Sequence, residues 1–218
     1  MEPITEETAP MAPVEEIKPE KPGILKYILP FLLIVLILTA DQILKIWVKK
    51  HMFPGEEKPI AGKWFLLHFI ENNGIAFGYE FSGNTGKLLL TLFRIFASCL
   101  IVYYLVTLIK RNVSYGLIIS VALIFAGATG NIIDSVFYGL WFKDINISTY
   151  DYQAGLFHGR VVDMLYFPVL QGHYPLWIPR FGGNEYIFFR PIFNLADSSI
   201  TIGVLLIILF FRKSLKRT

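Results

Sequence analysis

Four long apolar runs dominate the pattern of hydrophobic and polar positions along the chain. A helix that crosses a lipid bilayer needs about 20 mostly apolar residues, and each of the four runs is close to that length. Short polar segments separate the runs. The pattern therefore predicts an all-α membrane protein with four transmembrane helices, at about residues 24–47, 88–109, 115–138 and 191–211.

The composition agrees with a membrane protein. Hydrophobic residues make up 54% of the 218 residues, and the mean hydropathy is +0.53. The net charge of +3 is modest and gives no reason to expect binding to nucleic acid. Cys99 is the single cysteine and falls inside the second run, so a disulfide within the chain is excluded.

The two ends of the chain are polar and differ in charge. Residues 1–22 hold six Glu and five Pro with few large apolar side chains, which predicts a disordered, acidic cytoplasmic tail. The first apolar run is longer than the core of a secretion signal and continues past Asp41 without an Ala-x-Ala site, so we expect a retained helix. Residues 23–211 are expected to form one membrane domain, followed by a basic cytoplasmic tail at 212–218.

Positive charges predict how the helices are oriented in the membrane. Lys110 and Arg111 lie in the short turn between the second and third runs, and four cations follow the fourth run. Because cytoplasmic loops carry an excess of Lys and Arg, this turn and both termini are expected in the cytoplasm. Residues 48–87 and 139–190 then form the extracytoplasmic segments.

Polar side chains gather at one membrane face of the predicted helices. Asp41 and Asp134 fall near the ends of the first and third runs, and Asp197 falls near the start of the fourth. These depths coincide because the first and third helices run in one direction and the fourth returns. Asn131 and Asn194 each precede one of these acids by three residues, which places both members of each pair on one helix face.

Cations are expected beside these acids. Lys45 lies four residues after Asp41, an arrangement that favours an ion pair on a helix. Arg94 lies in the second run at a similar depth. Ionisable residues inside a membrane usually mark a functional site, although a polar network can also simply hold helices together. Asp163, just before the fourth run, brings the number of acids in the layer to four and favours function.

The outer segments predict β-structure and a cover for this layer. The first segment is prone to form strands and has a strong turn signal at Asn73-Gly74, so a short strand pair on the membrane surface is expected. The second is rich in Tyr, Trp and Phe. An aromatic belt at the membrane interface explains most of these rings. The functional alternative is a lid, or a rest for a substrate, over the acidic layer.

Motifs of several hydrolase classes are missing from the sequence. It has no His-Glu-x-x-His zinc motif and no Gly-x-Ser-x-Gly nucleophile turn, so neither a metal nor another cofactor is expected. Asp163 and Asp197 remain as two acids that can share a proton, one taking a proton from water while the other polarises a carbonyl. Such a pair hydrolyses a peptide bond without a covalent intermediate.

Two other functions use the same acids. A proton-coupled transporter or a scaffold would employ them as a relay, but the chain shows no internal repeat of the kind that transporters usually have. Another type of diaspartyl intramembrane protease would employ the same pair, but the chain lacks a Gly-x-Gly-Asp motif.

Five sequence blocks resemble those of the bacterial lipoprotein signal peptidases, the signal peptidase II family, and occur in the same order. Together they cover about residues 25–209. The blocks are Asp41-Gln42 with Lys45, Asn73-Gly-Ile-Ala-Phe-Gly78, Gly127-Ala-Thr-Gly-Asn-Ile-Ile-Asp134, Gly159-Arg-Val-Val-Asp163 and Phe193-Asn-Leu-Ala-Asp-Ser198.

The resemblance implies an aspartic endopeptidase of the bacterial cytoplasmic (inner) membrane. Such an enzyme removes signal peptides from prolipoproteins, cutting just before the diacylglyceryl-modified cysteine. The resemblance implies Asp163 and Asp197 as the catalytic pair at the outer face, a small extracytoplasmic β-sheet, and a periplasmic helix or loop that acts as a lid. The residues expected to line the site or bind substrate are Asp41, Lys45, Asn73, Gly74, Asn131, Asp134, Arg160, Asn194 and Ala196.

The expected partners follow from the same resemblance. They are diacylated prolipoproteins, membrane lipid and globomycin-like inhibitors. The chain is expected to act as a monomer.

Some residues depart from the family pattern. Ser135 stands where the family usually has Arg, and Met164 stands where Phe is common. Residues 143–156 and 171–186 look like insertions into the second outer segment. Because Ser135 leaves Asp134 without its usual cation, we expect Arg94 to lie on the inner face of the bundle and to reach Asp134 or Asp41.

Overall fold

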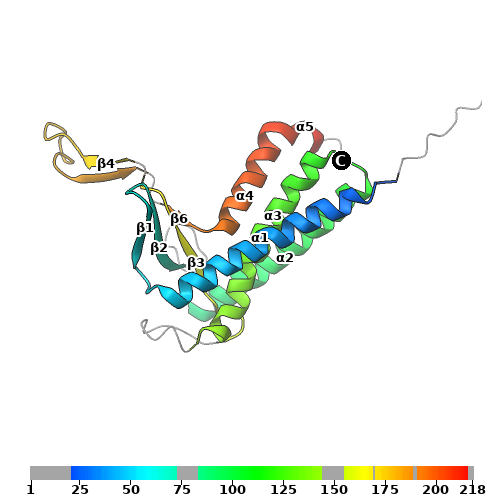
Figure 1. Ribbon diagram of the computed structural model, residues 1–218, viewed down its shortest axis with the longest axis horizontal. Helices are drawn as coiled ribbons and strands as arrows, with labels where there is room; N and C mark the ends of the chain where they lie inside the picture. The colour runs from blue at the N-terminus through cyan, green and yellow to red at the C-terminus, as the bar shows by residue number, and fades with distance from the viewer. Residues whose placement is uncertain (1–20, 73–82, 144–154, 169, 189–190, 216–218) are drawn as a thin grey trace, which may run out of the picture.

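Four long helices and a small sheet make up the computed structural model, which describes residues 21–72, 83–143, 155–168, 170–188 and 191–215 (Figure 1). All four helices contain a stretch that is long and apolar enough to cross a membrane, as predicted. Most of the predicted acidic tail lies outside the described residues. The helices are α1 (Leu25–His51), α2 (Gly83–Lys110), α3 (Tyr115–Trp141) and a fourth made of α4 (Leu195–Leu206), a π-helical turn η2 (Ile207–Phe211) and α5 (Arg212–Leu215).

The fourth helix begins later than the apolar run that predicts it. The run starts at Pro191, but Ile192 and Phe193 form a short strand, β6 (Ile192–Phe193), and the helix starts at Leu195. The change occurs at Asn194, whose extended backbone and side-chain oxygen cap the helix. Hydrophobicity alone does not separate a buried strand from the helix that follows it.

The predicted outer sheet is present and carries part of the polar layer. It is antiparallel, in the order β1-β2-β3-β6. Its register places Ile70 opposite Asp163 and Leu165 opposite Phe193. Asp163 therefore lies on a central strand, β3, which is paired with β2 on one side and with β6 on the other. The longer strands are β1 (Glu57–Ala61), β2 (Phe65–Asn72) and β3 (Val161–Tyr166).

A separate hairpin follows the sheet in the second outer segment. Strands β4 (Leu170–His173) and β5 (Glu185–Phe188) pair with each other and form a two-stranded sheet of their own. In Figure 1 this hairpin extends sideways from the sheet, at the end of the molecule far from the basic C-terminal helix α5. Most of this hairpin falls within the predicted insertion at residues 171–186.

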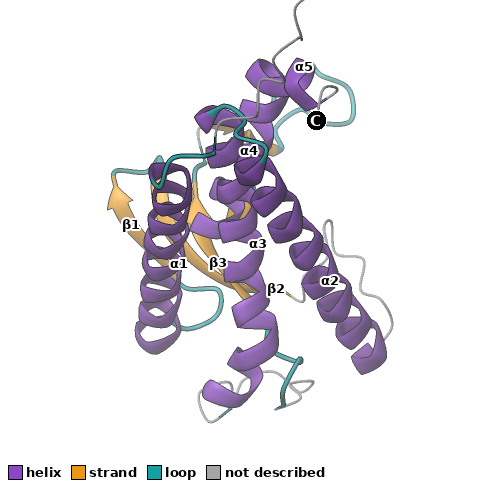
Figure 2. Cartoon of the chain, turned by 90° about the vertical axis from the view of Figure 1, so that its right-hand side faces the viewer, coloured by secondary structure: helices purple, strands orange, loops and turns teal. Residues whose placement is uncertain are grey.

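α3 is the central helix and separates two hydrophobic cores. It packs against α1, α2 and α4, and the sheet lies beside α1 and α3 (Figures 1 and 2). One core joins α2 to the first half of α3, through residues such as Leu108 and Ile118. The other joins α1, the sheet and the end of α3, through residues such as Phe69, Tyr138 and Met164. The polar layer lies between them, at residues 131–135 of α3.

Candidate active site

Lys45 joins two of the acids into one buried ion cluster. Its Nζ lies 2.8 Å from Asp41 Oδ2 and 2.8 Å from Asp134 Oδ2, and it donates to Asn131 Oδ1 at 3.0 Å. All three of its donor hydrogens therefore have an acceptor. Lys45 and Asp134 have no exposed side-chain surface and Asp41 has 1%. A buried charge needs such partners, because removing it from water without them costs several kcal/mol.

The two acids of this cluster also hold backbone from other elements. Asp41 Oδ1 accepts from the amide of Ala196 at 3.0 Å, and Asp134 Oδ2 accepts from the amide of Val162 at 3.3 Å. These bonds tie α1 to the first turn of α4, and α3 to the strand that carries Asp163. The Lys45 cluster thus sets the relative positions of the neighbouring elements.

Asp163 and Asp197 are held by amide side chains instead. Asn194 Nδ2 donates to Asp163 Oδ1 at 2.8 Å, and Asn72 Nδ2 donates to Asp163 Oδ2 at 3.1 Å. Asn131 Nδ2 donates to Asp197 Oδ1 at 2.7 Å. Asn194 also donates to Asn131 Oδ1 at 3.1 Å, so the amides that hold the two carboxyls bond to each other.

The local sequence explains why Asp197 lies beside Asn194. The amide of Asp197 donates to Asn194 Oδ1 at 2.8 Å, and the amide of Asn194 donates to Asp197 Oδ2 at 3.3 Å. This is a capping box, in which two residues three positions apart satisfy each other's backbone at the start of a helix. Asp197 therefore lies in the first turn of α4, where the helix dipole favours negative charge.

Burial and charge together alter the proton affinity of Asp163. Its side chain is in the strand region outside the spanning helices, and the residue is 4% exposed. Burial, and after it the negative charge of Asp197, raises the pKa of Asp163 to about 7. A carboxylic acid in this position keeps its proton in slightly acidic solution, where an ordinary carboxyl is ionised.

Small residues allow α4 to approach α3 closely at this point. A side chain at Gly127 would place its Cβ 2.2 Å from the carbonyl oxygen of Ala196. A Cβ at Gly130 would lie 2.9 Å from Asp41 Oδ2 and 3.1 Å from the Ala196 side chain. Gly127 and Gly130 thus leave the room that the first turn of α4 needs against α3.

Most of the residues expected around the site lie together. One expected residue lies in a different ion group, and two others fall in a part of the chain that the structure does not describe. Arg160 faces Glu71, with 3.8 Å between Nη1 and Oε2, in an ion group that also contains Lys49. Asn73 and Gly74 lie outside the described residues. The residues that the structure brings together as expected are Asp41, Lys45, Asn131, Asp134, Asp163, Asn194, Ala196 and Asp197.

Three members of the site were not expected from the sequence. Asn72 contacts Asp163. The sequence instead points to the next two residues, Asn73 and Gly74, because of their turn signal. Gln42 Nε2 donates to Asp134 Oδ1 at 3.0 Å, and its Oε1 accepts from the Tyr138 hydroxyl at 3.0 Å. Asn72 reaches Asp163 because it lies two positions after Ile70, the cross-strand partner of Asp163, and this register is visible only in the structure.

The role expected of Arg94 needs correction. Lys45, and not Arg94, forms the ion pair with Asp41 and with Asp134. Arg94 Nη1 is 3.3 Å from Ser135 Oγ, so its side chain does face α3. Arg94 therefore lies on the inner face of the bundle, as expected, but the bond described for it goes to Ser135, and the ion pairs described for Asp41 and Asp134 are with Lys45.

Comparisons with known proteins agree with this arrangement. Residues 33–213 match the family model described as signal peptidase (SPase) II. The chain is 45% identical to a lipoprotein signal peptidase of Porphyromonas gingivalis, over 84% of this chain and 82% of that one. It is 40% identical to a lipoprotein signal peptidase of Amoebophilus asiaticus, over 84% of this chain and 77% of that one.

A solved structure gives the same result for the fold. A bacterial membrane enzyme superimposes with a TM-score of 0.57 at 26% identity, covering 91% of this chain and 94% of that chain. The family match spans both outer segments and all four helices, and so includes each residue of the site. The chain belongs to the signal peptidase II family, the lipoprotein signal peptidases.

Proposed function

We propose that this chain is a membrane aspartic endopeptidase that removes signal peptides from diacylglyceryl-modified prolipoproteins, with Asp163 and Asp197 as its catalytic residues. One observation carries the choice of residues. Both carboxyls are bound to Asn194, one by its side-chain amide and the other by its backbone amide. The other two acids are both ion-paired with Lys45.

The surroundings of the two carboxyls give them different roles. Asp163, with its pKa raised to about 7 by burial and by the charge of Asp197, supplies the proton. Asp197 receives hydrogen bonds from Asn131 and from the amide of Asn194, and its oxygens act as the base. Acid and base in contact with one water molecule can both take part in the same hydrolytic step.

The reaction then needs no covalent intermediate. The oxygen of the water molecule attacks the scissile carbonyl carbon while Asp197 takes a proton from that water. Asp163 gives its proton to the carbonyl oxygen. The resulting gem-diol collapses, and the carbon–nitrogen bond breaks. The proton on Asp197 passes to the leaving nitrogen, and one hydroxyl proton returns to Asp163, which restores both groups.

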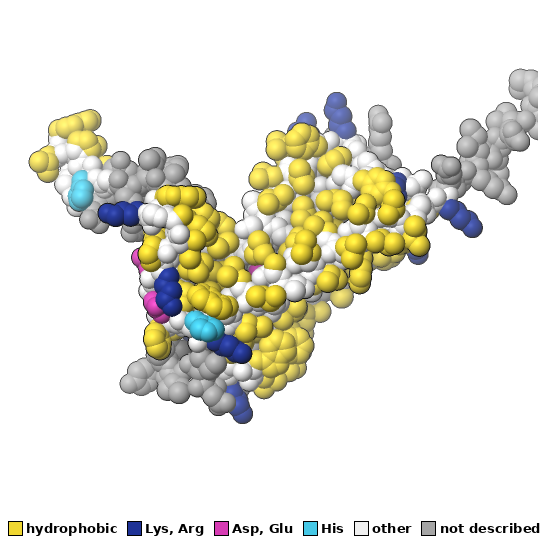
Figure 3. All heavy atoms as spheres, in the orientation of Figure 1, with side chains coloured by type: hydrophobic (Ala, Val, Ile, Leu, Met, Phe, Trp, Pro, Cys, Tyr) yellow, Lys and Arg dark blue, Asp and Glu magenta, His cyan; other side chains and the backbone are white. Residues whose placement is uncertain are grey.

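The shape of the surface supports access from the membrane. Figure 3 shows a hollow between the sheet and α4, lined by hydrophobic side chains, with an acidic side chain visible at its floor. An apolar signal peptide can lie against such a surface while acyl chains remain in lipid. The scissile bond would then reach the acidic pair at the level where α4 begins.

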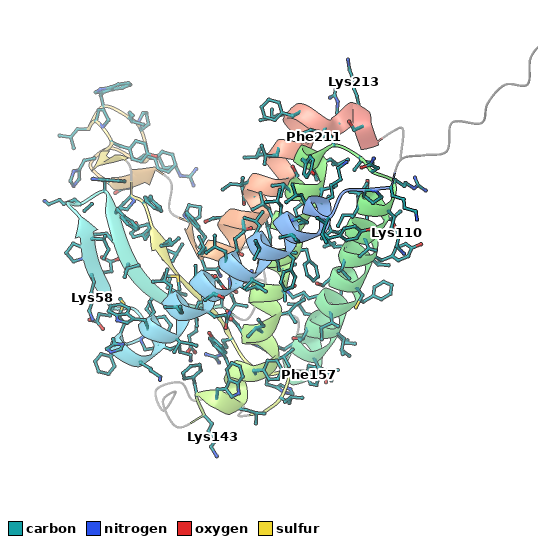
Figure 4. All side chains as sticks on the ribbon, turned by 45° about the vertical axis from the view of Figure 1, so that its right-hand side comes forward. Lys58, Lys110, Lys143, Phe157, Phe211 and Lys213 are labelled. Carbon is teal, nitrogen blue, oxygen red and sulfur yellow. The ribbon has the colours of Figure 1, made fainter. Side chains whose placement is uncertain are left out.

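The positions of the cations support a site at the outer face. Figure 4 shows Lys110 and Lys213 at one end of the helices and Lys58 and Lys143 at the opposite end, nearer the sheet. At the first end, Lys26 Nζ also bonds to the carbonyls of Asn112 and Val113, at 2.9 Å and 2.7 Å. The positive-inside rule places this end, with both termini, in the cytoplasm.

Cleavage of a lipid-modified prolipoprotein peptide tests the proposal. Asp163→Asn and Asp197→Asn should each lose at least about 10²-fold in kcat, the usual range for removing an acid or a base. Glu57→Gln, an acid-to-amide change on exposed β1, is the matched control and should retain activity. Retention of more than about a tenth of the rate in either Asp variant would remove that residue from the catalytic pair.

The same assay separates the alternative functions. The peptide with the diacylglyceryl group and the same peptide without it are compared in one detergent. Cleavage that needs the lipid supports a lipoprotein signal peptidase, whereas equal rates indicate a general diaspartyl intramembrane protease. A chain that cleaves neither peptide, yet moves protons across vesicles, would instead be a transporter.

A further inference from the structure

The turn of the β4–β5 hairpin presents large apolar side chains to the outside. We call residues 174–184, between the two strands, the hairpin tip. Leu176 is 88% exposed and Trp177 is 80% exposed, and Phe181 is 53% exposed. Side chains of this size are usually covered in a folded protein when they lie in a group, so a group of three exposed ones marks a contact surface.

The backbone of the hairpin tip is bonded within itself. The amides of Tyr174 and Gly183 bond to the carbonyls of Asn184 and Tyr174, at 2.9 Å and 2.8 Å. Three more amides in the tip donate to carbonyls of the tip, those of residues 178, 182 and 184, at 3.0, 2.9 and 3.0 Å. Pro175 and Pro179 have no amide hydrogen to satisfy.

The bonded part of this backbone suits an apolar environment, whereas the amides of Leu176, Trp177, Arg180 and Phe181 are not among the donors and suit the hydrated headgroup boundary. An unpaired amide or carbonyl in hydrocarbon costs several kcal/mol, so a loop that enters lipid must satisfy its own polar groups. Gly182 permits the compact turn, because a Cβ there would lie 2.6 Å from the Leu176 carbonyl oxygen.

The charge of the hairpin tip fits a phospholipid surface. Arg180 is the only charged residue between positions 174 and 184, and this stretch contains no acid. Arginine places its apolar stem along hydrocarbon while its head stays at the polar boundary. Tryptophan prefers the same boundary. An apolar turn with one cation is therefore complementary to lipid with anionic phosphates.

The hairpin tip also continues an aromatic surface of the sheet. A series of aromatic rings leads across the sheet to the base of the hairpin, with ring centroids 6.2 Å apart for Trp64 and Phe167 and 5.8 Å apart for Phe167 and Phe193. The hairpin itself extends sideways and does not continue outward along the helices (Figure 1). In Figure 3 its tip is hydrophobic, as are the helices across the hollow.

We propose that the hairpin tip inserts into the membrane leaflet next to the site. Leu176, Trp177 and Phe181 would lie between the headgroups and the acyl chains, with Arg180 at the phosphates. The hairpin then fixes the sheet to the bilayer on the side of the hollow. This contact involves lipid and no protein partner, and it does not depend on which residues carry out catalysis.

Depth measurements with an environment-sensitive fluorophore test this contact. Leu176→Cys in a Cys99→Ser background carries an NBD label in vesicles of phosphatidylethanolamine and phosphatidylglycerol. The native Cys99, exposed on α2, provides the deep reference. Lys143→Cys, exposed just after α3, provides the aqueous reference. Quenching is measured with spin-labelled lipids and with iodide in the water.

The expected result is an intermediate depth for the label at position 176. Its emission should shift to the blue relative to the label at 143. Lipid labelled near the headgroup should quench it more than lipid labelled deep in the chain, and iodide should quench it less than the label at 143. Adding Trp177→Ser and Phe181→Ser should shift the emission back to the red and restore iodide quenching.

Two outcomes would overturn the proposal. Iodide quenching equal to that of the label at 143 would place the hairpin tip in water. A blue shift in detergent-free vesicles that appears only when a second protein is added would make the tip a protein-binding surface. Neither result changes the assay for cleavage, so a failure here is distinct from a failure of the proposed catalytic pair.

Discussion

Asn194 and Asp197 each accept a hydrogen bond from the other's backbone amide, at 2.8 Å and 3.3 Å, and so close the first turn of α4 around the candidate active site. Asn194 combines this cap with a bond from its side-chain amide to Asp163 Oδ1. One residue therefore both starts a membrane helix and orients the two carboxyls relative to each other.

The two tasks of Asn194 can be separated by substitution. Asn194→Ala should lower stability by about 1 kcal/mol through loss of the cap, and should also lower kcat because Asp163 loses a donor. Asn194→Ser restores a capping oxygen without the amide. It should recover the part of the stability that the cap provides, but not kcat, because serine cannot replace the amide bonds to Asp163 and Asn131. A serine variant that recovered both would show that the bond to Asp163 is dispensable.

The pKa of Asp163 predicts how activity depends on pH. Asp163 must hold a proton to act as the acid, and its pKa is raised to about 7 by burial and then by the charge of Asp197. The rate should therefore fall as the pH rises through about 7. A kcat that is constant on both sides of this value would contradict the assignment.

The same shift predicts how stability depends on pH. The folded protein binds the Asp163 proton more tightly than the unfolded chain, in which the pKa is near the ordinary 3.8. This contribution to stability is complete below 3.8 and is lost as the pH rises to about 7. Asp163→Asn removes the dependence. The variant should gain stability relative to the wild type on the alkaline side, as measured by thermal unfolding in detergent.

Arg94 is expected to act on the acidic pair through its charge. Arg94→Leu removes a cation near Asp163, so the pKa of Asp163 should rise further and the alkaline limb of the rate profile should move to higher pH. Ser135→Ala is the matched control, because it removes the 3.3 Å contact of Arg94 and keeps the charge. If the two variants had the same pH profile, the charge of Arg94 would have no role.

Gly127 and Gly116 offer a second matched pair, both on α3. A Cβ at Gly127 would meet the Ala196 carbonyl at 2.2 Å, and a Cβ at Gly116 would meet the Phe211 ring at 2.2 Å. Gly127→Ala should cost about 1–3 kcal/mol of stability through overpacking against backbone. Gly116→Ala should cost less, because the end of the Phe211 side chain can move aside. Only Gly127→Ala should also lower kcat, since it displaces the turn that contains Asp197. Equal kcat values in the two variants would contradict this.

The parts of the fold that depend on local sequence could be predicted. Apolar length located the four helices, and the spacing of Asp41 and Lys45 predicted their ion pair. The second partner of Lys45 could not be predicted in this way, because Asp134 lies on another helix and their contact depends on packing. Arg94 does lie on the inner face of the bundle as expected, but the ion pairs expected for it are made by Lys45, for the same reason.

The strands next to the site were harder to predict than the helices. Ile192 and Phe193 continue the apolar run of the fourth helix, and only pairing with β3 reveals them as a strand. The turn signal of Asn73-Gly74 depends only on those two residues and says nothing about Asn72. The contact of Asn72 with Asp163 depends instead on the register of β2 on β3. Long-range pairing of this kind leaves no periodic trace in a single sequence.

The acidic pair is divided between a sheet and a helix. Asp163 lies on the central strand β3, and Asp197 lies in the first turn of α4. Any tilt of the sheet against the helices therefore changes the distance between the two carboxyls. The separation of the two carboxyls is therefore set by how the sheet and the helix bundle pack together, so a substitution far from both acids that shifts this packing should change their distance.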